Sequence, residues 1–202
     1  MFELIAIGAV ILVLVFWLIS VYNKFQTLKT QIEASIQEIG NQLKRQAELI
    51  PNLVNSVKGY MKHESQVFKM ITDARKGVED AVKNVQGEGA TDVQQLINAS
   101  EKLQQALQPI RLTFESTPEL KAEGPTSKLM DELRDTSDKV MYARRTLIDL
   151  TQDFNQMVVT VPSNFVAMLF SFKKQPGLKM PDADAATTAT AEEMKTPKVN
   201  LE

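Results

Sequence analysis

The sequence contains no cysteine, which excludes disulfides, thiolate catalysis, thiolate metal ligands and a lipidated-cysteine anchor. It has a single histidine, His63, so a zinc site would need three carboxylates, an unattractive ligand set for that metal. Neither charge is in clear excess, since the sequence has 23 basic and 25 acidic residues. This balance, without a basic surface studded with aromatic residues, argues against nucleic acid as a partner.

The N-terminus carries one long apolar run, LIAIGAVILVLVFWLI, at residues 4–19. With Phe2 and the exit at residues 20–22 it reaches the ~20 residues that cross a bilayer. Trp17 and Tyr22 lie near its end, where amphipathic rings prefer the membrane interface. A cleaved signal peptide would need a basic start and a small-residue cleavage site, and neither is present. We therefore expect a transmembrane anchor at residues 1–22.

The charges flanking this run predict its orientation. Lys24 and Lys29 follow it, whereas only the terminal amine and Glu3 precede its apolar core. Because positive residues favour the cytoplasmic side, we expect a single-pass protein of the inner (cytoplasmic) membrane with its C-terminal body in the cytoplasm.

The rest of the chain has helical periodicity. Apolar residues recur with a period near 3.5 over residues 22–85, and two further stripes cover residues 93–114 and 129–161. No strand-like alternation appears. The prediction is all-α: an up-and-down bundle of three, alternatively four, long helices at residues 23–174. Residues 175–202 are rich in proline, alanine and threonine and predict a disordered tail.

Pro51 lies inside the first stripe, and the spacing of the apolar residues is the same before and after it. Both a kinked continuous helix and a hairpin at Pro51 fit this pattern. A continuous helix would be too long for the other two helices to cover, which would leave an apolar coiled-coil seam at residues 22–50. A second copy of the chain would cover that seam, so we expect a homo-oligomer.

A polar face lies opposite Ile50 on the helical wheel of this stripe. It contains Arg45, Asn52, Gly59, His63 and Gly77. The two glycines fall at the same angle, and glycine on an exposed helix face costs about 1 kcal/mol. Either this face is a second interface that admits another backbone, or the glycines are simply tolerated there.

A short apolar segment, FVAMLFSFKK at residues 165–174, follows Pro162. It is too short to span a membrane, so it either plugs one end of the bundle or lies at a lipid interface. Its candidate residues are Phe165, Leu169, Phe170 and Phe172.

No catalytic, cofactor-binding or metal-binding residues are predicted. His63 and Glu64 form the first half of H-E-x-x-H, but Val67 occupies the position of the second histidine. Acid–base work by His63 would also need a nucleophile, an oxyanion hole and a pocket.

Several stretches resemble the LemA family: LKRQAELIPNLVNSVKGYMKHE (residues 43–64), PELKA (118–122) and FNQMVVTVPSNFVAMLFSF (154–172). The resemblance extends from the anchor to about Phe172, and the tail after Lys174 is this protein's own. The family often has a tyrosine in place of Phe154, a phenylalanine in place of Val161 and a glycine in place of Ser171. The resemblance implies a helical bacterial membrane protein with one N-terminal span. No catalytic activity is established for that family, and some relatives in magnetotactic bacteria are tied to membrane-compartment formation.

These observations predict a non-enzymatic, membrane-anchored helical scaffold. We expect it to contact membrane lipid and to self-associate or dock other membrane proteins at the cytoplasmic membrane face. One alternative is a membrane-remodelling protein that acts through residues 165–172. Another is a ligand-binding or enzymatic domain around His63.

Overall fold

The computed structural model describes residues 1–61, 64–85 and 90–175, which contain six helices and no strand. Four helices are long: α1 (Phe2–Val57), α2 (Glu64–Asn84), α3 (Ala90–Ser116) and α5 (Gly124–Val159). Two are short: α4 (Pro118–Ala122) and α6 (Ser163–Leu169). The predicted all-α class is confirmed.

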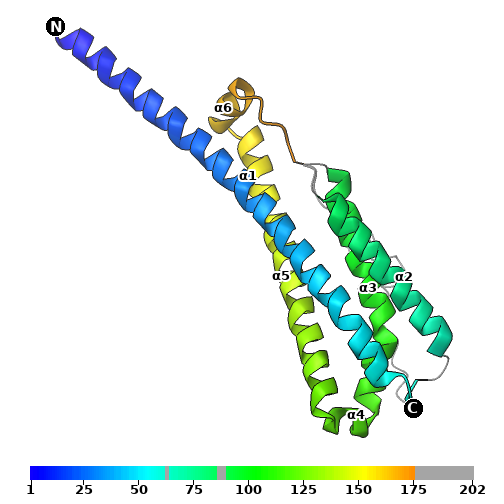
Figure 1. Cartoon of the computed structure of the whole chain (residues 1–202). Coiled ribbons are helices and arrows are strands. Elements are labelled where there is room, and N and C mark those ends of the chain that lie inside the picture. Colours follow the sequence, from blue (N-terminus) through cyan, green and yellow to red (C-terminus); the bar gives the residue numbers. More distant parts are fainter. Residues whose placement is uncertain (62–63, 86–89, 176–202) are drawn as a thin grey trace, which may run out of the picture.

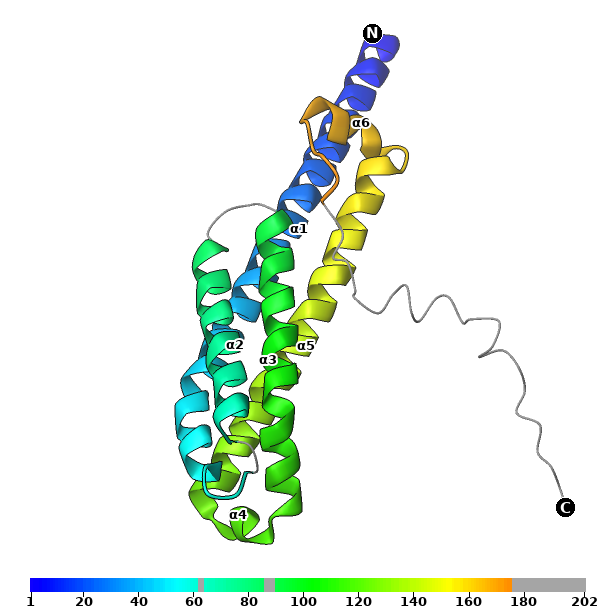
Figure 2. The same ribbon diagram turned by 90° about the vertical axis from the view of Figure 1, so that its right-hand side faces the viewer.

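The long helices form an up-and-down bundle (Figure 1). The chain descends along α1, returns along α2, descends again along α3, turns through α4 and ascends along α5 beside α1 (Figure 2). Pro118 occupies the first turn of α4, where its missing N–H leaves no hydrogen bond unmade. Of the two predicted helix numbers, the alternative with four long helices is the one observed.

The first stripe is divided between two helices. α1 passes through Pro51, which is exposed, and ends at Val57, where the Tyr60 N–H donates to the Val57 carbonyl at 3.0 Å. One helix as far as residue 85 is therefore wrong, and so is a hairpin at Pro51, because the chain reverses after Val57. Gly59, a poor helix former, lies in the reversal. The apolar spacing continues across the reversal because Val57, Met61 and Ile71, on both sides of it, pack in the same core.

α1 and α5 pack antiparallel in a constant register. The rings of Phe25 and Phe154 lie 5.4 Å apart, and farther along α1 Gln46 donates to the Ser137 hydroxyl at 3.0 Å. In this register α5 ends opposite about Tyr22.

The apolar side chains of residues 22–50 are accordingly covered within the chain. Phe25, Ile39, Leu43 and Ile50 are all buried. The uncovered seam expected for a second copy is absent from the described structure. The prediction of such a seam failed because it took residues 22–85 as one helix. Since the chain reverses after Val57, α5 is long enough to cover the part of α1 that lies in the bundle.

The N-terminal part of α1 extends beyond the bundle (Figure 1). Every residue from Phe2 to Phe16 is exposed. By length and composition this part of α1 can cross a membrane. The apolar stretch and the bundle core thus share one uninterrupted helix.

A matched pair of truncations tests the covered seam. Leu43 is 0% exposed, so Leu43→Ala should lower the free energy of unfolding by about 2–5 kcal/mol. Leu112 on α3 is 62% exposed, and Leu112→Ala should change it by less than about 0.5 kcal/mol. Chemical denaturation of the full chain in detergent measures both. Because the cover is intramolecular, the loss of stability caused by Leu43→Ala should be the same at every protein concentration. A loss that changes with concentration would return the seam to an interface between copies.

Candidate functional site

An aromatic cluster closes the bundle at the point where α1 leaves it. Phe25 stacks on Phe172 with ring centroids 4.6 Å apart, and Tyr22 lies 4.6 Å from Phe170. Phe154 of α5 meets Phe172 edge-on at 6.2 Å. Such aromatic pairs contribute about 0.5–1.5 kcal/mol each beyond their buried area. The cluster joins α1, α5 and the segment after α6.

The turn after α6 directs Phe172 into this cluster. The Phe172 N–H donates to the Ala167 carbonyl at 2.9 Å and the Ser171 N–H to the Met168 carbonyl at 3.3 Å. This is the Schellman pattern of a helix C-terminus, in which the residue at the Ser171 position takes a left-handed conformation. Ser171 has φ 56°, a region that favours glycine. The glycine often found here in the resembled family therefore has a conformational reason.

The two faces of α6 have different surroundings. Val166 and Ala167 are buried against the bundle, whereas Phe165, Met168 and Leu169 are exposed. Of the predicted residues, Phe172 thus closes the bundle, Phe165 and Leu169 point outward, and Phe170 is exposed on one side while packing on Tyr22. The segment therefore closes one end of the bundle with Phe172 and also exposes apolar side chains; contact of those side chains with lipid stays a prediction.

The chain after this turn is bound to α5. The Asn155 amide nitrogen donates to the Gln175 carbonyl at 2.7 Å, and the Gln175 N–H donates to the Asn155 side-chain oxygen at 2.7 Å. An open groove of about 680 Å³ runs beside this contact. Its lining consists of Ile148, Thr151, Gln152, Asn155, Gln156, Val159 and Lys174. Among the described lining residues Lys174 is the one with a charged side chain.

A polar cluster lies inside the bundle, where α1, α3 and α5 meet. The Ser137 hydroxyl accepts hydrogen bonds from the side chains of Gln46 at 3.0 Å, Arg111 at 3.0 Å and Gln104 at 3.2 Å. It also donates to the Leu133 carbonyl at 2.7 Å. Three donors approach the two lone pairs of one hydroxyl. Gln46 and Ser137 are buried, so the cluster joins three helices at one height.

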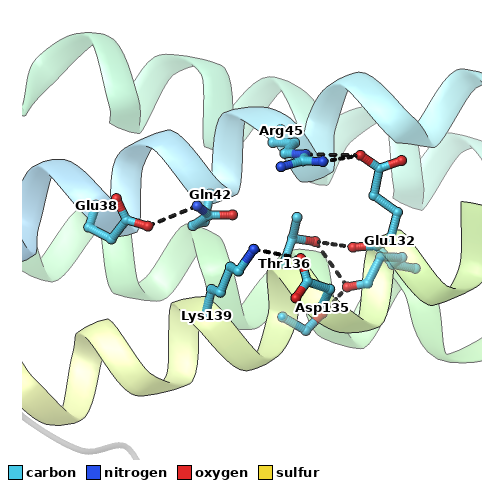
Figure 3. A network of polar contacts seen from close by, with 9 residues as sticks. Glu38, Gln42, Arg45, Glu132, Asp135, Thr136 and Lys139 are labelled. Carbon is cyan, nitrogen blue, oxygen red and sulfur yellow. Dashed lines mark hydrogen bonds and ion pairs between the residues drawn. The ribbon is translucent and has the colours of Figure 1, made fainter.

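A second polar contact bridges α1 and α5 on the surface (Figure 3). Arg45 donates through Nε to Glu132 at 3.0 Å, and its Nη2 also contacts that carboxylate. The hydrogen bond that Arg45 donates to Glu132, and then the negative charge of Glu132, raise the pKa of Arg45 above its usual value. Arg45, an interface candidate from the sequence, is thus already paired within the chain.

The other polar-face candidates are separated. Asn52 is exposed on α1, Gly59 lies in the turn after α1, and Gly77 is on α2. The two glycines therefore do not share a helical face, and that step of the prediction is wrong. Space is open around the Cβ position of each. Contact of these residues with a partner stays a prediction, and His63 lies outside the described residues.

Fold and site together define a class: a four-helix bundle whose first helix continues outward as an exposed apolar rod, with an aromatic end closure beside that rod. The model of the LemA family matches residues 35–194. The chain belongs to the LemA family. The match begins within α1 beyond the apolar run and continues into the tail, farther than the resemblance to about Phe172 had indicated. No curated protein matches the chain.

The left-handed conformation of Ser171 predicts that glycine substitutions at two serines change the free energy of unfolding in opposite directions. Ser171→Gly should raise the free energy of unfolding by up to about 1 kcal/mol, because it relieves a left-handed serine. Ser35 lies within α1, and Ser35→Gly should lower it by about 0.5 kcal/mol through lost helix propensity. Thermal or chemical unfolding of the full chain measures both. Destabilisation by Ser171→Gly of the same size as at Ser35 would contradict the assigned turn.

Proposed function

We propose that this protein is a non-enzymatic scaffold, anchored in the cytoplasmic membrane by the apolar part of α1, with its bundle in the cytoplasm. There it self-associates or docks partner proteins. The observation that carries the proposal is the continuity of α1 from the apolar stretch into the bundle core. A helix without a break transmits position and orientation from the bilayer to the bundle.

Polar contacts between helices support a structural role. They include the buried contact of Gln46 with Ser137 and the half-buried pair of Arg144 and Glu101, at 2.7 Å between α5 and α3. Groups committed to each other in this way align helices. These cross-helix contacts favour a scaffold.

The far end of the bundle is the proposed docking surface. Asn52 lies near the C-terminal end of α1, Gly59 and Tyr60 follow that helix, and all three are exposed. This end of α1 lies at the end of the bundle opposite α6 (Figure 1). An exposed tyrosine beside an uncrowded glycine offers a ring that a partner can cover with little loss of side-chain freedom.

Membrane remodelling through residues 165–172 is the second candidate. The exposed apolar side chains of α6 and their position beside α1 favour it. It differs from the scaffold proposal in requiring that the protein change the shape of vesicles.

Single cysteines test the proposed topology, since the natural chain has none. Tyr142 is 75% exposed on α5 and Phe2 is 91% exposed at the start of α1. In intact cells a membrane-impermeant maleimide should label Phe2→Cys and should reach Tyr142→Cys only after lysis. The reverse pattern would place the bundle outside the cytoplasm.

Leucine substitution tests the docking surface. Because Gly59 has open space around its Cβ position, Gly59→Leu should leave the unfolding temperature of the monomer unchanged while reducing the mass of the assembly. Light scattering of the full-length protein in detergent measures that mass. Gln105→Leu adds the same side chain at an exposed position of α3 and should alter neither quantity. A wild-type protein that is monomeric in detergent and cross-links to no other protein in its membrane would contradict the scaffold.

A further inference from the structure

We infer that α6 and its flanking turns, residues 159–170, form a second membrane contact that inserts into the same bilayer leaflet through which α1 leaves the membrane. This inference rests on the proposed anchoring of α1. The occupant of the exposed apolar face is thus lipid. The contact is monotopic: α6 has seven residues, too few to cross a bilayer, but an apolar face can lie at the boundary of headgroups and acyl chains.

The outward face of this segment has the composition of a lipid-facing surface. Val159, Val161, Phe165, Met168, Leu169 and Phe170 are all exposed large apolar residues. No charged residue occurs from Phe154 to Phe172. Elsewhere the long bundle helices turn charged side chains outward, as at Lys44 and Glu48 of α1. A contiguous apolar surface of this kind marks an interaction site.

α6 also lies at the height along α1 that insertion into this leaflet requires. Trp17, Leu18, Val21 and Tyr22 of α1 pack against the bundle core, and Phe170 stacks obliquely on Tyr22 with ring centroids 4.6 Å apart. Trp17 is still inside the apolar run that ends at residue 19. Both views place α6 beside α1 at this level (Figures 1 and 2). A bilayer that contains residues 4–19 therefore extends to the depth at which α6 lies.

Charged residues begin just below this level on both elements. Lys173 and Lys174 follow Phe172 directly and are exposed, and Lys24 is exposed on α1 two residues after Tyr22. Lysines at this depth reach the phosphate groups while their stems remain near the acyl chains. The boundary between apolar and basic residues is thus the same for α1 and for the segment that follows α5.

This common boundary favours lipid over a second protein. Once α1 spans the bilayer, lipid already surrounds α1 at the height of α6. A protein partner would have to displace that lipid from Phe165, Met168 and Leu169, with a membrane-embedded apolar surface of its own.

Depth-dependent quenching of single labels tests the inference on the full chain. Met168 is 78% exposed, so Met168→Cys carries an environment-sensitive fluorophore without disturbing the core. The protein is reconstituted into vesicles of phosphatidylcholine and phosphatidylglycerol with a nitroxide near the headgroup or near the bilayer centre. Val13→Cys, in the exposed part of α1, reports the anchor, and Tyr142→Cys on α5 reports the bundle surface in water.

The expected result is strong quenching of the Met168 label by the shallow nitroxide and weaker quenching by the deep one, since a monotopic helix lies about 5–10 Å into the interface. The Val13 label should be quenched most by the deep nitroxide and the Tyr142 label by neither. A Met168 label that stays unquenched while Val13 is quenched overturns this inference and leaves the anchor intact. A blue-shifted Met168 label without lipid quenching also overturns it, because a protein surface then covers α6. An unquenched Val13 label means that the proposed anchoring itself has failed.

Discussion

The antiparallel packing of α1 on α5 is the interaction on which the other features depend. It buries the apolar stripe of α1 over residues 25–57 and sets the height at which α5 ends. As a result, Phe154 contacts Phe25, and the chain that follows α5 lies beside the apolar part of α1. A different register would still form a bundle, but α6 would then lie at another distance from the apolar run.

Polar contacts fix this register more sharply than apolar packing can. Apolar ridges tolerate a shift by one turn, whereas the hydrogen bond from Gln46 of α1 to the Ser137 hydroxyl of α5 does not. Gln104 and Arg111 hold α3 to the same hydroxyl. A shift would leave the buried amide of Gln46 unpaired at a cost of about 1–3 kcal/mol. The ion pair of Arg45 and Glu132 marks the same register on the surface. Stability thus comes chiefly from the apolar stripe and specificity from a few polar atoms.

Composition and periodicity predicted the helical class, the apolar run and the end of α5 near Pro162. They failed at the reversal after Val57, because a heptad-like spacing continues across it. Pro51 is also a stronger helix breaker than Gly59, although the chain turns at Gly59. The Ser137 cluster was missed although a signal exists: Gln46 lies at a seam position between Leu43 and Ile50, and Ser137 lies between Leu133 and Val140. The aromatic closure joins residues up to about 150 positions apart, which no local pattern can reveal.

The unbroken course of α1 also gives the molecule a mechanical property. About 54 Å of the helix lies on the bundle side of the aromatic closure and about 30 Å on the other side, at 1.5 Å per residue. A rigid rotation about that closure would have arms in a ratio of nearly two to one. A sideways displacement at the far turn reaches the N-terminal end at about half its size and in the opposite direction. A force applied to the bundle therefore becomes a tilt of α1.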